Sequence, residues 1–551
     1  MVRNSLRTAG LAASGLAAVG ALVAVAAFGG SVATSIVPTD SRYRDVAHLT
    51  QTVQVAPGPV TLVCPPPARL PVGADFDEDF ATSPVPTTST IAVGVIGMPV
   101  TAAWGLLGGE PDPIPFGVNA VVRATPLPPD QHVGSLLVAQ PKQDAPFHAA
   151  GAIAAVTTLG DLRGLAAAPC TEPATSQWLI GGDTAVGSTA VLTVTNPGEQ
   201  SATITLRVYG EAGPVSLGAQ GQFVVGPGAA EQVRLEAVAP GERLLAVQVL
   251  AVGGRVAASL QVQRLDGLIP MGTDLIVPVA AARERVVITG LVSDGQAAGE
   301  ANAPMLRLLA PGDEPVQVAL SVYGEDGPVA GFQNWQDELP PNTVFEISLG
   351  GLPAGTHAVA IRAEAPVLAA ASFTRIAPTP EDALVPGNPF DVAWVPGVPG
   401  PPPPTTETRL PGDAMSTTQA ALPPGVQATL TLFATPWHFE YCPADAECEP
   451  PQPWAEFVVR VYGADGDLLV TRELTLDEGE VLRLPVAGLT SGGTPVLVSV
   501  TTACCRAVAW SVELTANDGS ALPATLVSLL PPTPGAATPG TVTVRETSAI
   551  G

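Results

Sequence analysis

One short segment occurs three times in this chain, and it constrains the fold more than any other feature. In each copy, apolar and polar side chains alternate up to a tyrosine, which is the period of a half-buried strand. The glycines that follow suit a tight turn, because glycine reaches positive φ without a steric penalty. Each copy therefore predicts a strand that ends in a turn, with its tyrosine as a framework residue at the edge of a core. The copies are RVYGEAGP at 207–214, SVYGEDGP at 321–328 and RVYGADG at 460–466.

Short β-branched runs separated by Pro- and Gly-containing turns continue along the chain beyond residue 50, as in all-β sandwiches. The fold we expect is all-β, with tandem immunoglobulin-like β-sandwiches after one N-terminal transmembrane helix. The repeat indicates three sandwiches, at 175–280, 281–395 and 405–516, with a Pro-rich linker at 396–404. The remaining parts are a cytoplasmic tip, anchor and stalk at 1–44, a divergent N-terminal β domain at 45–174, and a C-terminal segment at 517–551 with a disordered tail.

The N-terminus contains the chain's longest apolar run. Arg3 and Arg7 precede an uncharged stretch, and residues 11–33 are long enough to cross a bilayer as a helix. The basic flank predicts a cytoplasmic N-terminus and an extracytoplasmic remainder in a single-pass membrane protein. The alternative is a signal peptide cleaved near the small residues at 31–33, which would make the protein secreted.

Six cysteines fit an exported protein, because disulfides form in oxidising compartments. Cys64 and Cys170 lie at strand ends at opposite limits of the N-terminal domain, and we expect them to be bonded. Cys504-Cys505 aligns with the turn at 253–254 of the first sandwich, so we expect two disulfides that join it to Cys442 and Cys448. The alternative is a Cys442–Cys448 bond with a vicinal Cys504–Cys505 pair.

Those cysteines accompany an aromatic insertion in the third sandwich. Trp437, Phe439, Tyr441 and Trp454 fall within 18 residues, and exposed aromatic side chains often form the centre of a binding surface. The insertion is therefore a candidate binding loop. The alternative, that these rings pack beneath their own loop, stays open.

Composition and motifs exclude several classes of function. The chain has 24 Lys and Arg against 50 Asp and Glu, a net charge of −26, so it lacks a basic surface for nucleic acid. The sequence contains no nucleophile elbow, phosphate-binding loop or zinc-protease motif. We therefore predict no enzymatic activity, no catalytic or metal-binding residue and no cofactor.

Four segments and two cysteines carry a family resemblance. They are WLIGG at 178–182, LTVTNPG at 192–198, VYG at 208–210 and GGRVAA at 253–258, together with Cys64 and Cys170. These segments resemble an actinobacterial family of single-pass exported proteins catalogued as a domain of unknown function. The resemblance extends over about residues 45–515, and it implies no catalytic residues, because the family has none assigned.

These features together predict a non-enzymatic, membrane-anchored protein of the cell envelope. Its sandwiches would serve structural or binding roles, with a cell-wall polymer or another envelope protein as partner. The alternative is a carbohydrate-active enzyme or an accessory subunit of envelope glycan assembly.

Overall fold

The computed structural model describes most of the chain beyond residue 49. The larger of its two compact units covers 56–540, and the smaller covers 1–55 and 541–551. In the smaller unit, β1 (Thr50–Val55) pairs with β37 (Gly540–Arg545). The described residues are 50–55, 57–70, 87–97, 100–142, 145–380, 385–400, 416–436, 454–504, 507–533, 536–537 and 540–545.

The all-β prediction is confirmed for this part of the chain. Its two α-helices, α2 (Leu235–Val238) and α3 (Val486–Leu489), have four residues each. The anchor predicted at 11–33 lies outside the described residues, and within them no helix is long and apolar enough to cross a membrane.

The N-terminal sandwich consists of two four-stranded layers around one core. The core contains apolar residues of both layers, and the pattern of alternating burial along the strands places them there. One layer has the order β2 (Val60–Cys64), β7 (Ser135–Pro141), β4 (Val100–Leu106), β5 (Asp112–Ile114). The other has β6 (Ala120–Pro126), β3 (Thr88–Ile96), β8 (Phe147–Thr157), β9 (Gly164–Pro169).

The first and third sandwiches have the same strand order, and the core of the third is continuous with buried residues of the N-terminal sandwich. One layer of the first sandwich has the order β10 (Ser176–Ile180), β16 (Ala246–Val252), β12 (Ala202–Gly210), and both β13 (Gly213–Val215) and β14 (Gln222–Val225) pair with β12. Its other layer has the order β15 (Ala229–Arg234), β11 (Ser188–Asn196), β17 (Ala257–Asp266), β18 (Ile269–Ile276). The third has β28 (Ser416–Ala421), β33 (Pro495–Cys504), β30 (Trp454–Gly463), β31 (Leu468–Asp477) over β32 (Val481–Pro485), β29 (Gln427–Ala434), β34 (Val508–Ala516), β35 (Leu526–Leu530).

The second sandwich differs because one long strand runs through both layers. The first half of β25 (Gly355–Ile376) pairs with β19 and β21, and its second half with β20 and β26. The other strands are β19 (Arg283–Ser293), β20 (Met305–Leu309), β21 (Val316–Gly324), β22 (Gly327–Pro328), β23 (Trp335–Leu339), β24 (Val344–Ser348), β26 (Phe390–Pro396) and β27 (Val398–Pro399).

Within the C-terminal segment, for which the Pro and Gly content indicated a disordered tail, the structure describes several short strands. β35 completes a layer of the third sandwich by pairing with β34, and Thr533 donates a backbone hydrogen bond to Gln419. β36 (Ala536–Ala537) then pairs with β8, and β37 follows. These short segments pair with neighbouring strands that offer a free edge. Local composition gives no information about such pairing.

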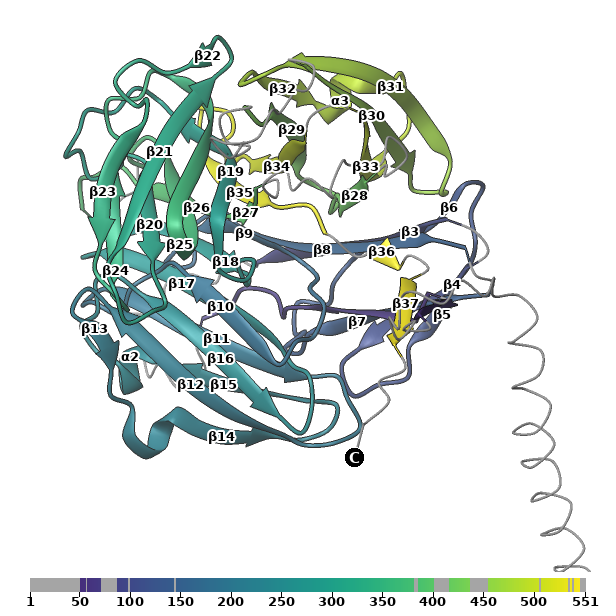
Figure 1. Cartoon of the computed structure of the whole chain (residues 1–551). Helices are drawn as coiled ribbons and strands as arrows, with labels where there is room; N and C mark the ends of the chain where they lie inside the picture. Colours follow the sequence, from purple (N-terminus) through teal and green to yellow (C-terminus); the bar gives the residue numbers. More distant parts are fainter. Residues whose placement is uncertain are drawn as a thin grey trace, which may run out of the picture. The chain divides into compact units, whose positions relative to one another are not determined.

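Within the larger unit, the four sandwiches contact one another in a cycle (Figure 1). The turn that carries the repeated glycines reaches the next sandwich in each case. The ring of Tyr323 lies 5.2 Å from that of Phe433, and a Cβ at Gly479 would lie 3.2 Å from Tyr323. Gly466 of the third sandwich accepts a 2.8 Å hydrogen bond from the backbone of Asn119, which closes the cycle onto the N-terminal sandwich.

The other two contacts have the same form. A Cβ at Gly213 would lie 3.8 Å from Thr343 of the second sandwich, and a Cβ at Gly108 would lie 3.2 Å from the carbonyl of Gly228. Trp104 stands four residues before Gly108, as the repeated tyrosines stand before their own glycines. The N-terminal sandwich is thus a fourth copy of the unit, with Trp in place of Tyr.

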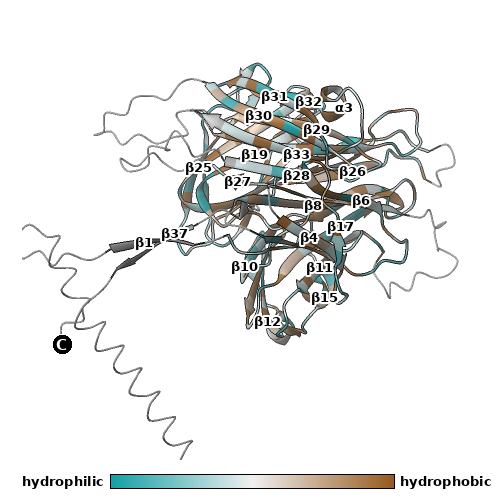
Figure 2. Cartoon of the chain, turned by 90° about the vertical axis from the view of Figure 1, so that its right-hand side faces the viewer, coloured by the Kyte–Doolittle hydropathy of each residue, from teal (hydrophilic) through white to brown (hydrophobic). Residues whose placement is uncertain are grey.

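One strand near the C-terminal end of each sandwich lies at the centre of the cycle. β9 contacts β18, β18 contacts β26, β26 contacts β35, and β35 contacts β9. These strands are largely buried, in keeping with strands covered on both faces. Figure 2 shows hydrophobic stretches along many strands of the larger unit.

Candidate functional site: a central junction and an adjoining groove

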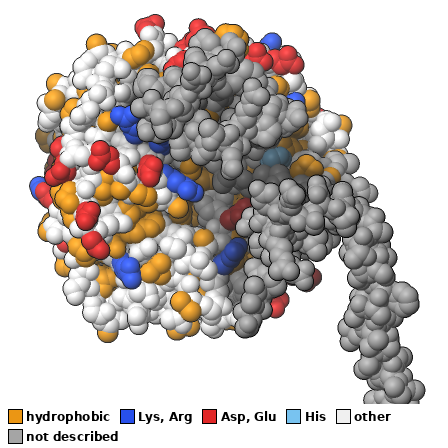
Figure 3. Space-filling model, viewed as in Figure 1, with side chains coloured by type: hydrophobic (Ala, Val, Ile, Leu, Met, Phe, Trp, Pro, Cys, Tyr) orange, Lys and Arg blue, Asp and Glu red, His pale blue; other side chains and the backbone are white. Residues whose placement is uncertain are grey.

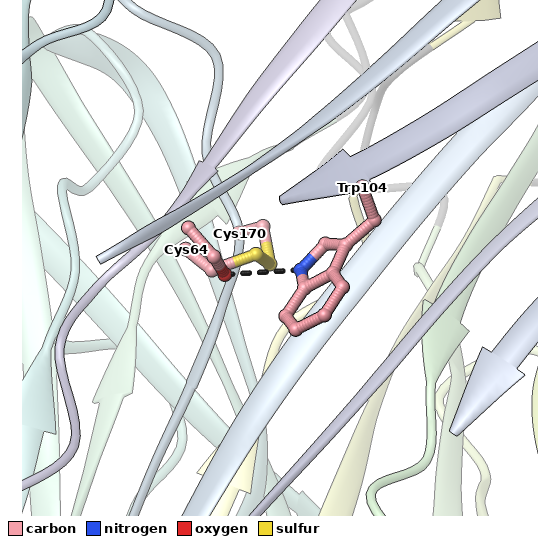
Figure 4. Close-up of a disulfide and its surroundings, with 4 residues drawn as sticks. Cys64, Trp104 and Cys170 are labelled. Atoms are coloured by element: carbon pink, nitrogen blue, oxygen red, sulfur yellow. Dashed lines mark hydrogen bonds between the residues drawn. A yellow bond between two sulfur atoms is a disulfide. The ribbon is translucent and has the colours of Figure 1, made fainter. Parts of the chain in front are cut away.

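The predicted Cys64–Cys170 disulfide is present. It joins residues 106 apart in the sequence, with their Cα atoms 4.0 Å apart, at the ends of β2 and β9. Trp104 lies beside it (Figure 4), and its indole N–H donates a 3.1 Å hydrogen bond to the Ser135 hydroxyl. The bond closes the N-terminal sandwich, as the positions of the two cysteines in the sequence indicated.

The rest of the predicted aromatic and cysteine site falls mostly outside the described residues. Trp437, Phe439, Tyr441, Cys442, Cys448 and Cys505 are all in that group. Trp454 begins β30 and Cys504 ends β33.

The described backbone places the residues that flank the insertion beside β33 and beside Ala507, the first described residue after that strand. Cys504 lies opposite Glu456 in the sheet, and the Thr435 N–H donates to the Ala507 carbonyl at 3.1 Å. The described residues at the two ends of the insertion therefore lie close to Cys504 and Ala507. The disulfide pairing and the binding loop stay predictions.

Two buried aspartates, Asp274 and Asp391, lie where β9, β18, β26 and β35 meet, and we call this pair the central junction. The side chain of Asp274 is 1% exposed. One oxygen accepts a 2.8 Å hydrogen bond from the backbone N–H of Trp394, and the other a 2.8 Å bond from the Ser528 hydroxyl. The backbone N–H of Ala167 is 3.5 Å from the same oxygen as Ser528. A carboxylate of the first sandwich thus contacts the other three.

Asp391 of the second sandwich forms the other half, and its side chain is 0% exposed. Its Oδ2 accepts backbone hydrogen bonds from Leu165 at 2.9 Å and Val527 at 2.7 Å, in the N-terminal and third sandwiches. The Thr273 N–H of the first sandwich lies 3.4 Å from Oδ1. This carboxylate also joins all four sandwiches.

Burial dominates the electrostatics of the junction. It raises the pKa of Asp274 to about 8 and that of Asp391 to about 7. The hydrogen bonds from backbone N–H groups favour the ionised form and lower both pKa values, but burial has the larger effect. Arg163 lowers the pKa of Asp391, while it bonds the Phe390 carbonyl at 3.0 Å and Asp518 at 2.6 Å. Raised carboxyl pKa values often mark catalytic acids, but no substrate reaches side chains this deeply buried.

A groove of about 670 Å³ lies beside the junction, at the seam between the first and second sandwiches. We call it the seam groove. Both sandwiches contribute to its walls, and charged side chains of both signs line it together with apolar ones. The residues are Asp183, Ala185, Val186, Ser188, Glu211, Arg243, Leu244, Arg264, Arg307, Pro340, Thr343, Val344, Phe345 and Glu346.

Arg307 connects the seam groove to the central junction. Its side chain is 9% exposed and forms a 2.7 Å ion pair with Glu346. Its guanidinium also donates to the Gly182 carbonyl and stacks 4.8 Å from the Trp394 ring. Because the Trp394 backbone donates to Asp274, the floor of the groove is fixed to the junction.

The remaining charges of the groove are more exposed. Arg243 and Glu211 form a 2.7 Å ion pair at the rim. The Arg264 side chain is exposed and makes no hydrogen bond or ion pair with any residue that the structure describes. One oxygen of Asp183 accepts a 3.1 Å bond from the Ala185 N–H. Acidic and basic side chains are interspersed on the face of the molecule that Figure 3 shows.

Sequence reasoning missed both the junction and the groove. A signal for the junction existed, because Asp274 and Asp391 stand within otherwise apolar strand patterns, and a buried carboxylate requires partners. Nothing local identified those partners, which lie more than a hundred residues away in the sequence. Over the described ranges, no three His, Cys, Asp or Glu side chains gather in a way that could hold a metal ion.

The chain is similar to three solved structures, at low identity. The crystal structure of Thermotoga maritima 1070 has 15% identity and a TM-score of 0.17, covering 21% of this chain and 93% of that one. The BSP domain of a biofilm-associated protein has 8% identity and a TM-score of 0.11, covering 93% and 100%. The pilus adhesin SpaC from Lactobacillus rhamnosus GG has 10% identity and a TM-score of 0.09, covering 81% and 56%.

No curated protein matches the chain. A family model does match, over residues 127–436, which is more than half of the sequence. The matched region runs from the N-terminal sandwich into the third one, and it contains Asp274, Asp391 and every residue that lines the seam groove. The chain belongs to the family of unknown function DUF5719.

Proposed function

We propose that this protein is a non-enzymatic, membrane-anchored protein of the cell envelope that acts as a rigid binding scaffold. Its tandem immunoglobulin-like β-sandwiches would stand outside the membrane on one N-terminal helix, with the seam groove as the binding site. The resemblance to single-pass exported actinobacterial proteins supports this location. The Cys64–Cys170 disulfide also supports it, because such bonds persist in oxidising compartments.

One observation carries the proposal: the connection from Arg307 through Trp394 to Asp274. The groove takes residues from two sandwiches, and a two-sided site needs both sides held in a fixed relation before the ligand arrives. Preorganisation of this kind reduces the ordering entropy lost on binding. The central junction supplies the fixed relation, because its two carboxylates bond all four sandwiches.

The side chains of the junction and the groove support the alternative function, a carbohydrate-active enzyme, less well. Glycoside hydrolysis uses two carboxyl groups that face each other across an open cleft. The junction carboxylates are buried, and Glu211 and Glu346 of the groove each pair with an arginine. A binding site accommodates such ion pairs more readily than a hydrolytic site does.

The test is retention of soluble envelope polymers by the full chain, solubilised in detergent and immobilised. We expect retention by the wild type and its loss in the double variant Arg243→Ala, Arg264→Ala. Arg472→Ala is a matched control, because Arg472 is exposed on β31 of the third sandwich. Equal retention by the double variant would overturn the proposed site. Release of shortened polymer would favour the enzyme instead.

A further inference from the structure

The seam groove offers hydrogen-bond donors and acceptors that no described residue of the chain uses. The guanidinium donors of Arg264 are free within the described ranges, and the Arg243 side chain uses one nitrogen in its ion pair with Glu211. On the acceptor side, Asp183 and Glu211 each have one oxygen with a described partner. A ligand that fits must therefore both donate and accept hydrogen bonds.

The charges of the groove balance one another. Its lining contains Arg243, Arg264 and Arg307, and against them Asp183, Glu211 and Glu346. The chain as a whole has a net charge of −26, so its overall field repels polyanions. A balanced groove in an acidic protein favours a ligand without net charge.

Apolar side chains lie between these charges. Val186 is fully exposed, and Leu244 and Phe345 are half-buried on opposite sides of the seam. Pockets for small ligands combine such apolar surface with a few placed polar groups, and their volumes of about 300–1,000 Å³ include that of this groove.

We propose that the seam groove binds a neutral oligosaccharide. This inference rests on the proposed function and names the ligand class of the same site. Each sugar hydroxyl both donates and accepts a hydrogen bond, which matches guanidinium and carboxylate groups placed side by side. The C–H faces of the sugar rings would pack on Val186 and Phe345. Arg307 and Glu346 would form the rigid floor, and Arg264 and Asp183 would supply the adaptable contacts.

The experiment measures binding of four hexasaccharides to the full chain by calorimetry. Cellohexaose and chitohexaose are neutral, hexagalacturonate is anionic and the chitosan hexamer is cationic. We expect the two neutral probes to bind more tightly than the charged ones. Arg264→Ala and Asp183→Ala should each weaken neutral binding about tenfold, which is the loss expected for a hydrogen bond to a charged group. Arg472→Ala should leave the affinity unchanged.

Binding of only the charged probes, no binding of either neutral probe, or equal affinity in Arg264→Ala would each overturn the proposal. Thermal unfolding of each variant shows whether it is folded, since Arg264 is exposed but Asp183 is half-buried. Suppose that neither neutral probe binds, but that envelope polymer is retained by the wild type and lost in the double variant Arg243→Ala, Arg264→Ala. The ligand class is then wrong, and the proposed binding function stands. If the polymer is retained without those arginines, the proposed site fails as well.

Discussion

The central junction and the seam groove are built from the same kinds of side chain, but these meet different partners. In the junction, Asp274 and Asp391 are buried and bond mainly backbone N–H groups of other sandwiches. In the groove, Glu211 and Glu346 pair with arginines and stay partly exposed. A buried carboxylate with fixed partners defines a geometry, whereas an exposed one keeps capacity for a ligand. We therefore expect the junction to stabilise the fold and the groove to bind a ligand.

Removal of a junction carboxylate should have the largest effect on stability. Asp391→Ala leaves the buried N–H groups of Leu165 and Val527 without acceptors, and each such group costs about 1–3 kcal/mol. We expect the free energy of unfolding to fall by about 2–6 kcal/mol in urea titrations. Asp266→Ala, at an exposed position on β17, is the control and should change it by less than about 0.5 kcal/mol. A change of that small size in Asp391→Ala would remove the distinction between junction and groove.

The pH dependence of stability should also originate in the junction. The folded-state pKa values of about 8 for Asp274 and about 7 for Asp391 lie above the value of roughly 3.9 for an unfolded chain. The folded state therefore binds more protons between about pH 4 and 8, and its stability falls as the pH rises through that window. Asp518 has the opposite sign, since hydrogen bonds from Ser520 and Arg163 outweigh burial and lower its pKa to about 2.

Urea titrations across this pH range test the assignment. We expect a lower free energy of unfolding at pH 8 than at pH 5, and a shallower slope in Asp274→Asn. The effect should be smaller than that of Asp391→Ala, because ionisation keeps every backbone hydrogen bond in place. Rising stability from pH 5 to 8 would contradict the raised pKa values.

Arg307 lies between the two regions and should have an intermediate effect. Its replacement by Ala leaves Glu346 and the Gly182 carbonyl without their partner and removes the stacking on Trp394. We expect a loss of about 2–4 kcal/mol in thermal or urea unfolding. Arg307→Lys should recover only part of it, since lysine keeps the charge without the planar fork. Full recovery by Lys would mean that charge alone matters at this position.

Removal of the exposed arginines should have the smallest effect on stability. The Arg243–Glu211 ion pair is well exposed, and solvent screening leaves such pairs little effect on stability. The double variant Arg243→Ala, Arg264→Ala should therefore unfold at nearly the same urea concentration as the wild type in the same titrations. A clearly lower urea concentration would give these side chains a structural role and weaken the case for a binding site.

Local patterns predicted strands but not the contacts between sandwiches. The alternation before each VYG segment indicated β12, β21 and β30, and the positions of Cys64 and Cys170 indicated their bond. The repeated tyrosine was interpreted as a framework residue of its own sandwich, yet Tyr323 packs on Phe433 of the next one. Sequence spacing carries no information about such a neighbour, because the contact depends on how the units pack.

The N-terminal sandwich and the seam groove are two further features that local sequence patterns did not predict. Trp104 replaces the tyrosine of the repeat, so the fourth copy was interpreted as a divergent domain. The seam groove takes its lining from residues 183–346, which only the packing of two sandwiches brings together. The candidate loop at 437–454 was the visible feature in the sequence, since aromatic residues are rare elsewhere in the chain.

Amide hydrogen exchange of the full chain most directly tests the claim that the four sandwiches form one cooperative unit. The N–H groups of Leu165, Trp394 and Val527 belong to three sandwiches and bond the junction carboxylates. We predict that all three exchange only through global unfolding, with the same free energy, and that Asp391→Ala lowers that shared value. Separate free energies for the three peptides, unchanged in Asp391→Ala, would mean that the sandwiches open independently.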